Sequence, residues 1–280
     1  MQIARTAAEL RACVAALRAD GRRVGFVPTM GNLHEGHYSL LQVARAHAAH
    51  VVASVFVNPT QFGPHEDYAR YPRTPEADAN GLRQHGCDVL FAPQVAELYP
   101  DGIEHGVRVS VPALGGVLEG AVRPGHFDGV ATVVSKLFNL VQPDLAVFGQ
   151  KDYQQLLVIR RLVRELRFPI EVIAAPIVRE ANGLAMSSRN QYLDVATRAR
   201  AGAIHAALQA MAAGVRAGEA HEALETAAQA SLVAAGLVPD YALLRRADDL
   251  GEPAAGQRSA LVALIAARAG STRLIDNVLI

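Results

Sequence analysis

Apolar and polar residues alternate along the first two thirds of the chain in a way that predicts strands separated by helices. Short, nearly continuous apolar runs are typical of strands buried on both faces of a parallel sheet, and stretches with helical apolar spacing lie between them. This alternation predicts βαβ units and a doubly wound parallel sheet. The predicted strands are residues 23–27, 51–57, 88–92, 145–148 and 170–174, and the predicted helices are residues 6–18, 40–50, 75–85, 130–141 and 154–166.

After Asn190 the pattern changes. Two Ala-rich amphipathic stretches predict helices, and three later apolar runs predict strands of a small separate sheet. We therefore expect a domain boundary within residues 177–190 and divide the chain into residues 1–183 and a smaller α+β domain of residues 184–280. The expected helices are residues 196–213 and 221–235, the expected strands are residues 240–244, 260–267 and 272–276, and a loop is expected over residues 246–257.

The most informative polar segment is PTMGNLHEGH, at residues 28–37. It follows a predicted strand and opens a predicted helix, where free backbone N–H groups and the positive end of the helix dipole are expected to favour phosphate. His34 and His37 lie three residues apart, so on a first helical turn they share one face. Two imidazoles there can donate hydrogen bonds to phosphate oxygens, and Gly36 lets a ligand approach the backbone. Taken alone, the pair is also compatible with ordinary polar surface.

Other polar segments follow the later predicted strands. Residues 58–62 follow the second strand, residues 149–155 follow LAVF at 145–148, and residues 178–180 come shortly after IEVIA at 170–174. Because ligands of doubly wound sheets bind outside the carboxyl ends of the strands, we expect these segments to converge on one site.

Several side chains in these segments suit a nucleotide and a hydroxylated substrate. Lys151 can neutralise phosphate charge and Asp152 can accept from ribose hydroxyls, although this pair is also compatible with a surface ion pair. AMSSRN at 185–190 offers hydroxyls and a guanidinium for phosphates, or simply a polar loop or helix cap. Gln61 and Gln155 suit a hydroxylated substrate, or are surface amides. RPGHF at 123–127 is expected to form a loop near the site.

Composition narrows the class of protein. The 280 residues carry a formal net charge of +0, which argues against a nucleic-acid partner. The two cysteines, Cys13 and Cys87, have no metal-ligand spacing, and two isolated thiols suit a cytoplasmic location. No apolar stretch reaches the roughly 20 residues that a membrane span needs, and no signal peptide is recognisable. Walker A and G-x-G-x-x-G motifs are absent from the sequence.

These segments resemble the pantoate–β-alanine ligase family over essentially the whole chain. The resemblance is carried by PTMGNLHEGH at 28–37, FVNPTQF at 56–62, DYARYPRT at 67–74, the long segment 123–155, GLAMSSRNQYL at 183–193 and TRLIDN at 272–277, whereas residues 196–257 match less clearly. It implies a Rossmann-like α/β fold with an HxGH motif similar to that of nucleotidylyltransferases. Residues 1–183 then bind nucleotide and pantoate, and residues 184–280 form a small lid domain.

The resemblance also implies an activity and a site. The family is a group of AMP-forming ligases that join pantoate to β-alanine through a pantoyl adenylate, with ATP as substrate, Mg²⁺ as cofactor and a homodimeric assembly. The implied catalytic residues are His37, His34 and Lys151, with His37 the proton donor. The implied ATP-binding residues are Met30, Gly31, Asn32, Leu33, His34, Glu35, Gly36, His37, Gly149, Gln150, Lys151, Asp152, Val178, Met186, Ser187, Ser188 and Arg189. Gln61 and Gln155 are implied to bind pantoate, Gln61 also β-alanine, and no residue is implied as a protein ligand of the metal.

Other classes remain open from the residues alone. The H-x-G-H turn is similar to that of nucleotidylyltransferases, which move AMP onto a phosphorylated acceptor, and of class I aminoacyl-tRNA synthetases. A synthetase needs a basic tRNA-binding face, which the neutral charge does not favour. A non-enzymatic nucleotide-binding module leaves the many polar residues at successive strand ends unexplained.

Overall fold

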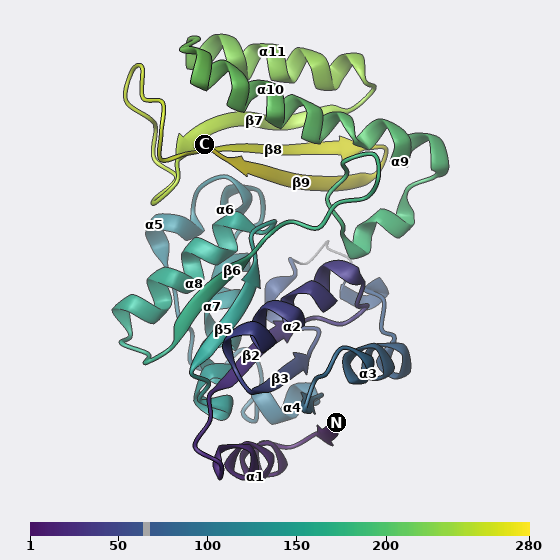
Figure 1. Cartoon of the computed structure of the whole chain (residues 1–280), viewed down its shortest axis with the longest axis vertical. Helices are drawn as coiled ribbons and strands as arrows, with labels where there is room; N and C mark the ends of the chain where they lie inside the picture. Colours follow the sequence, from purple (N-terminus) through teal and green to yellow (C-terminus); the bar gives the residue numbers. More distant parts are fainter. Residues whose placement is uncertain (64–67) are drawn as a thin grey trace. The chain divides into compact units, whose positions relative to one another are not determined.

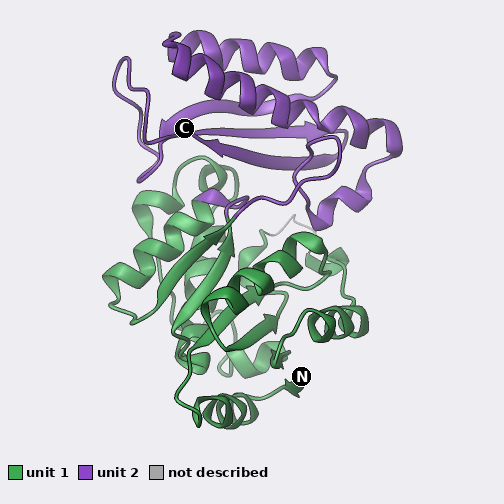
Figure 2. Cartoon of the chain, viewed as in Figure 1, with its two compact units in different colours: residues 1–149, 154–175 green, residues 150–153, 176–280 purple. Residues whose placement is uncertain are grey.

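The computed structural model describes residues 1–63 and 68–280, and the chain divides into two compact units (Figure 2). Unit 1 comprises residues 1–149 and 154–175, and unit 2 comprises residues 150–153 and 176–280. Asp67, which opens the segment DYARYPRT, lies outside the described residues. The predicted boundary after residue 183, and the binding roles predicted for the two parts, stay predictions.

Unit 1 is built on a six-stranded sheet in which all neighbouring strands are parallel, in the order β1-β4-β3-β2-β5-β6. The order reverses at β2, because the chain continues through β3 and β4 on one side and through β5 and β6 on the other. The carboxyl ends of β2 and β5 therefore flank the switch point at which doubly wound sheets bind ligands. The strands are β1 (Gln2–Ala4), β2 (Val24–Thr29), β3 (His50–Val55), β4 (Val89–Phe91), β5 (Leu145–Gly149) and β6 (Glu171–Ala175).

Helices cover both faces of this sheet (Figure 1). Phe26 of β2 meets Phe138 of α7 edge to face, with ring centroids 6.4 Å apart, whereas Val27 joins an apolar cluster with Leu40 and Leu41 of α2. Successive strand residues point to opposite faces, so α2 and α7 lie on opposite sides of β2. The helices are α1 (Ala7–Arg18), α2 (Glu35–His47), α3 (Pro75–Gln84), α4 (Val95–Leu98), α5 (Pro112–Gly115), α6 (Glu119–Val122), α7 (His126–Val141) and α8 (Tyr153–Glu165), with 3₁₀ turns η1 (Pro59–Gln61) and η2 (Tyr68–Arg70).

Unit 2 contains a three-stranded antiparallel sheet in the order β7-β8-β9, covered by α10 and α11 (Figure 1). Leu208 and Met211 of α10 and Leu244 and Ile265 of the sheet are almost completely buried in its apolar core. The elements are η3 (Ser188–Tyr192), α9 (Val195–Ala201), α10 (Ala203–Ala217), α11 (His221–Ala234), β7 (Val238–Arg246), β8 (Leu261–Ala269) and β9 (Thr272–Leu279).

The predicted doubly wound parallel sheet and the small α+β part are both observed, with shifted boundaries. β1 was not predicted, because it has three residues and only Ala4 is buried. Helix α2 begins at Glu35, before the predicted start at Leu40, because His34 caps it. Strand β7 continues to Arg246, which the Gly/Pro content had assigned to a loop, because Arg246 pairs with Leu261 of β8.

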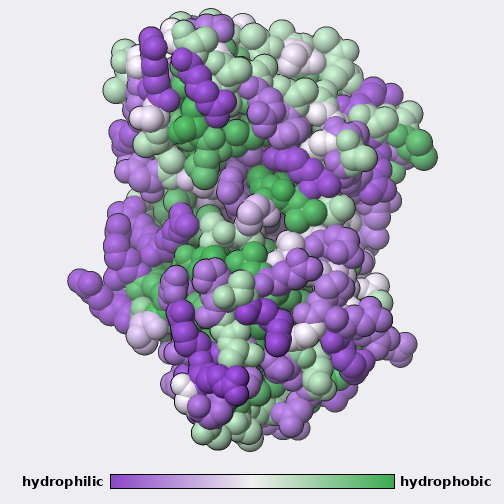
Figure 3. Space-filling model, in the orientation of Figure 1, coloured by the Kyte–Doolittle hydropathy of each residue, from purple (hydrophilic) through white to green (hydrophobic). Residues whose placement is uncertain are grey.

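The described part of the chain has no helix that is long and apolar enough to cross a membrane. Figure 3 shows hydrophilic residues over much of the visible surface, with apolar residues interspersed among them. Of the two thiols, Cys87 is buried and Cys13 is partly exposed.

Candidate active site

The turn between β2 and α2 brings His34 and His37 together, as the spacing predicted. Gly31 and Asn32 have φ values of 84° and 51°, so two left-handed residues redirect the chain from strand to helix. His34 is the N-cap of α2 and His37 lies at the third helical position. Their ring centroids are 4.1 Å apart, and both rings lie just beyond the carboxyl end of β2.

Hydrogen bonds to the backbone define the tautomer of both rings. Nδ1 of His34 accepts from the N–H of Gly36 at 3.1 Å, and Nδ1 of His37 accepts from the N–H of His34 at 3.3 Å. A ring nitrogen that accepts a hydrogen bond carries no proton, so in the neutral imidazole the proton is on Nε2. Each ring is therefore set to donate from Nε2, as binding to a phosphate oxygen requires.

The backbone of the turn differs from our expectation of free N–H groups. The N–H groups of Asn32 and Leu33 donate to the carboxylate of Asp78, at 3.0 and 2.8 Å. Other N–H groups have acceptors within the turn, namely those of Gly31, His34, Gly36 and His37. The turn therefore offers an anion its imidazole donors and the positive end of α2 rather than an open cradle of amides.

Asp78 is a residue of this turn that the sequence did not reveal. It lies on α3, its side chain is almost completely buried, and it also accepts from the hydroxyl of Thr74 at 3.0 Å. A buried carboxylate is stable only with such donors around it. The sequence signal was only an acidic residue early in a helix, which is common where the helix dipole favours negative charge.

Gln61 lies after β3 in a buried polar cluster. Its Oε1 accepts from Nδ2 of Asn58 at 3.0 Å, and the hydroxyl of Tyr99 donates to Oδ1 of Asn58 at 2.8 Å. Burial raises the pKa of Tyr99, so its hydroxyl stays protonated as a donor. With Oε1 engaged in this way, the Gln61 amide has a fixed orientation. Asn58 was not among the predicted site residues, although it directly follows the strand.

The segment expected to form a loop near the site contacts Gln61, but its last two residues, His126 and Phe127, belong to the first turn of α7. Nδ1 of His126 lies 2.8 Å from the carbonyl oxygen of Gln61, and Arg123 donates to the same oxygen at 3.1 Å. Gly129 makes this packing possible, because a Cβ there would lie 2.3 Å from the carbonyl oxygen of Thr60. The segment 123–129 thus fixes the backbone of the η1 turn that carries Gln61.

Two more predicted residues of unit 1 lie at the carboxyl end of the sheet. Gly149 is the last residue of β5, and Gln155 is in the first turn of α8, which follows that strand. The turn residues 30–37, Gln61 and Gln155 thus follow the parallel strands β2, β3 and β5 directly or by a few residues, and Gly149 ends β5.

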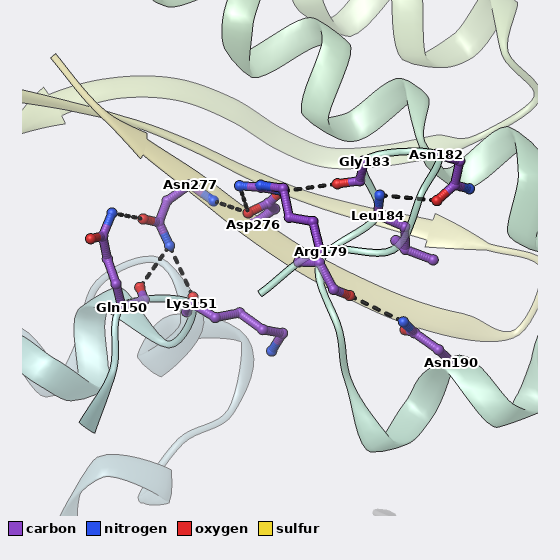
Figure 4. A network of polar contacts seen from close by, with 10 residues as sticks. Gln150, Lys151, Arg179, Asn182, Gly183, Leu184, Asn190, Asp276 and Asn277 are labelled. Carbon is purple, nitrogen blue, oxygen red and sulfur yellow. Dashed lines mark hydrogen bonds and ion pairs between the residues drawn. The ribbon is translucent and has the colours of Figure 1, made fainter. Parts of the chain in front are cut away.

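The remaining predicted residues belong to unit 2. Residues 150–153 carry Lys151, whose Nζ lies 3.3 Å from Oδ1 of Asp152, and the Lys151 side chain is 20% exposed. Carbonyl oxygens of Gln150 and Lys151 both accept from the side chain of Asn277 on β9 (Figure 4). The Lys151–Asp152 ion pair, which the sequence left open as an alternative to a nucleotide role, is therefore present on a backbone segment that is hydrogen-bonded to the antiparallel sheet.

The other segment of unit 2 is a small hairpin followed by η3. Val178 accepts a hydrogen bond from the N–H of Met186 at 2.9 Å, so two predicted nucleotide-binding residues are adjacent. Ser187 is the N-cap of η3, and its Oγ accepts from the N–H of Arg189 at 3.3 Å. The capping role that we considered for this loop is thus real for Ser187.

An ion pair between the half-buried Arg179 and the buried Asp276 supports the hairpin. Arg179 binds the carboxylate of Asp276 through two contacts of 2.5 and 3.0 Å and also donates to the carbonyl oxygen of Gly183 at 3.0 Å (Figure 4). Asn190 donates to the carbonyl oxygen of Ala185 at 3.1 Å. The hairpin that precedes residues 186–189 is therefore fixed at both ends.

Comparison with known proteins covers almost the whole chain. The family model described as "Pantoate-beta-alanine ligase" matches residues 2–279. A pantothenate synthetase of Xylella fastidiosa (strain 9a5c) is 59% identical over 269 residues, which are 96% of this chain and 95% of that protein. One of Stenotrophomonas maltophilia (strain K279a) is 57% identical over 270 residues, again 96% of this chain and 95% of its own.

Solved structures agree with this match. The pantothenate synthetase of Thermus thermophilus superposes with a TM-score of 0.92 at 48% identity, covering 99% of both chains. A pantoate–β-alanine ligase of Francisella tularensis, described as complexed with beta-gamma ATP and β-alanine, gives a TM-score of 0.80 at 33% identity and covers 100% of this chain and 97% of that one.

Proposed function

This chain belongs to the pantoate–β-alanine ligase family, and from that premise we propose that it makes pantothenate in two steps. In the first, a carboxylate oxygen of pantoate attacks the α-phosphorus of ATP, and the bond to the β-phosphate breaks to release pyrophosphate. In the second, the amine of β-alanine attacks the acyl carbon, loses a proton, and displaces AMP. The full-length family match carries this proposal. The same match favours the ligase over the nucleotidylyltransferase alternative.

The imidazoles of His34 and His37 support the first step. A carboxylate and a triphosphate repel each other, so attack at phosphorus needs donors directed at the charge that develops there. Both rings have Nδ1 engaged by backbone N–H groups, which leaves the proton on Nε2. We assign His34 and His37 to phosphate binding and His37 to proton donation. Met30 and the turn through His37 hold the region of the α-phosphate.

The other nucleotide contacts are assigned from the family resemblance, and the chemistry of several of these residues supports the assignment. Lys151 and Arg189 supply positive charge for the phosphates. Ser187 and Ser188 bind the phosphates through their hydroxyl groups, and Met186 lies beside them. Asp152, with Gly149, accepts from the ribose hydroxyls. Gln150 lies in the same segment, and Val178 recognises adenine through its backbone.

Gln61 and Gln155 are assigned to pantoate, and Gln61 also to β-alanine. The fixed orientation of the Gln61 amide supports this assignment, because a positioned amide can distinguish hydroxyl from carboxylate groups.

Mg²⁺ is expected to enter with ATP. Among residues 1–63 and 68–280 no group of three or more His, Cys, Asp or Glu side chains is arranged to hold a metal ion. From the family resemblance, we propose that the ion is carried mainly by phosphate oxygens and water, as Mg²⁺ commonly is with nucleotides. Bound in this way, the ion neutralises charge on the departing pyrophosphate.

Two further properties rest on the family resemblance and on the cysteines. We propose a homodimer, which sedimentation at several concentrations tests, and a cytoplasmic location that suits two unpaired thiols.

The function is tested by measuring pyrophosphate and AMP release from Mg-ATP and pantoate, with and without β-alanine. We expect AMP turnover and an amide product only when both substrates are present. Pyrophosphate formed once per site with pantoate alone identifies the adenylate intermediate. Transfer of AMP to a phosphorylated acceptor, with no reaction of pantoate, contradicts the proposal and supports the nucleotidylyltransferase alternative.

A further inference from the structure

Asn277 has a position in β9 that the activity itself does not explain. Its side chain is 1% exposed, and its Nδ2 donates to two successive carbonyl oxygens, those of Gln150 and Lys151, at 2.9 Å each (Figure 4). Its Oδ1 lies 3.4 Å from Nε2 of Gln150. A single buried amide thus makes all of these bonds to a segment more than 120 residues earlier in the chain.

The two carbonyl groups are significant because of where they lie. The carbonyl of Gln150 belongs to the peptide plane before the Cα of Lys151, and the carbonyl of Lys151 belongs to the plane after it. Peptide planes are rigid, so fixing both of them fixes φ and ψ of the residue between. Asn277 therefore sets the direction in which the Lys151 side chain leaves the backbone.

Asn277 is itself held firmly. Its N–H donates to Oδ1 of Asp276 at 2.8 Å, and the Asp276 carboxylate is bound by Arg179. The Asp276 side chain is only 3% exposed. In the antiparallel ladder Asn277 is paired with Leu264 of β8. The amide thus acts from a rigid sheet rather than from a loop.

We propose that Asn277 is a positioning residue for Lys151: it orients the lysine toward the phosphates of ATP without touching the substrate. This inference rests on the phosphate-binding role proposed for Lys151. The bonds also keep two carbonyl dipoles directed at Asn277. A residue that only stabilised the fold would have a different effect. Its loss would lower the activity with every substrate to the same extent, whether Lys151 is present or substituted.

The test is Asn277→Asp, which keeps the size of the side chain and replaces the donor by an acceptor facing two carbonyl oxygens. We expect kcat/KM for ATP in pantoate-dependent pyrophosphate release to fall on the order of 100-fold, since small displacements of a positioned group have effects of this size. KM for β-alanine should not change. Leu279→Ala, at a 44% exposed position of the same strand, is the matched control and should behave as wild type.

A double-mutant cycle with Lys151→Ala separates positioning from general damage. In the Lys151→Ala background we expect Asn277→Asp to lower kcat/KM less than about threefold, because the side chain that it orients is already gone. An equal fall in both backgrounds overturns the proposal. Circular dichroism checks folding, and if Asn277→Asp does not fold, Asn277→Ser, which keeps one donor, takes its place with a smaller loss expected.

Failure of the proposed function gives a different result. If wild type forms no pantothenate, or if Lys151→Ala is as active as wild type, the role of Lys151 falls and this inference falls with it. If Lys151→Ala loses activity while folded Asn277→Asp and Asn277→Ser keep it, only the positioning role is overturned.

Discussion

The two units fix their predicted phosphate-binding segments by opposite chemistry. In unit 1 the carboxylate of Asp78 accepts from two backbone N–H groups of the turn before α2. In unit 2 the amide of Asn277 donates to two backbone carbonyl groups around Lys151. Both side chains are almost completely buried, and each comes from an element distant in sequence from the segment that it holds.

The difference determines which backbone groups are already hydrogen-bonded in each segment: N–H groups in the turn before α2, and carbonyl groups around Lys151. Asp78 occupies two N–H groups of that turn, and the imidazoles are the side-chain donors that we assign to an anion there. Asn277 donates to two carbonyl oxygens, so these negative dipole ends beside Lys151 are paired with its amide. We call Asp78 the accepting anchor and Asn277 the donating anchor. Four substitutions test the contrast between them.

The largest expected effect is on the free energy of unfolding, from loss of the Arg179–Asp276 ion pair beside Asn277. Arg179→Met leaves the carboxylate of Asp276 buried without its ion-pair partner, and we expect a loss of about 4 kcal/mol in the free energy of unfolding. Urea unfolding followed by circular dichroism measures it. Arg268→Met, which removes a more exposed ion pair with Asp240, is the control and should change stability by less than about 1 kcal/mol. Equal effects of the two variants would show that Asp276 does not depend on Arg179.

His37→Ala tests the source of donors in unit 1. We expect the transition state to lose about 3 kcal/mol of stabilisation, as for deletion of an oxyanion donor. The value of kcat/KM for ATP should therefore fall on the order of 100-fold. His47→Ala, at an exposed position near the other end of α2, should leave steady-state rates unchanged. Wild-type kcat/KM in His37→Ala would remove this ring from the mechanism.

Asp78→Asn weakens the accepting anchor while keeping its shape. An amide cannot accept at both of its terminal atoms, so at least one buried donor loses its partner, and we expect a loss of about 2 kcal/mol in unfolding free energy together with lower activity. Glu76→Gln, an exposed change on the same helix, controls for loss of charge in the first turn of α3. A folded Asp78→Asn protein of wild-type stability would mean that the turn before α2 keeps its conformation without the Asp78 carboxylate.

The smallest effect is a pH dependence near the ion pair of unit 2. Burial chiefly, and then the charge of Arg179, lower the pKa of His205 below its ordinary value of 6.5. The unfolded state then binds more protons between the folded-state pKa and 6.5, so this residue makes stability fall as pH drops through that window and contributes no slope above it. Urea unfolding at about pH 5 and about pH 8, on either side of the ordinary histidine pKa, should therefore differ less in His205→Gln than in wild type, while His47→Gln keeps the wild-type difference.

Local pattern was enough to predict much of the fold. The apolar runs of β3 and β5, the helical spacing of α2 and the H-x-G-H spacing are all features of neighbouring residues. The three-residue β1 was missed because its stability comes from pairing with β4, which is distant in sequence.

The two anchors were missed for a similar physical reason. Asp78 is 46 residues from Asn32 and Asn277 is 126 residues from Lys151, so neither pairing leaves a local pattern. Asp78 looked like any acidic residue early in a helix. Asn277, although part of the familial segment TRLIDN, directly followed the predicted strand 272–276 and looked like any polar residue at a strand end. The predicted site residues themselves, which were assigned by resemblance, stay predictions until the substitutions are made.

The distance in sequence between Lys151 and Asn277 has a consequence during synthesis of the protein. Chains are made from the N-terminus and domains fold as they emerge, so the His34–His37 turn and its Asp78 anchor can form early. The backbone around Lys151 can be fixed only after Asn277 of β9, 126 residues later in the chain, has been synthesised. A nascent chain thus has its histidine pair in place well before its lysine is oriented, and premature termination before β9 leaves a protein with only the first half of its phosphate-binding apparatus.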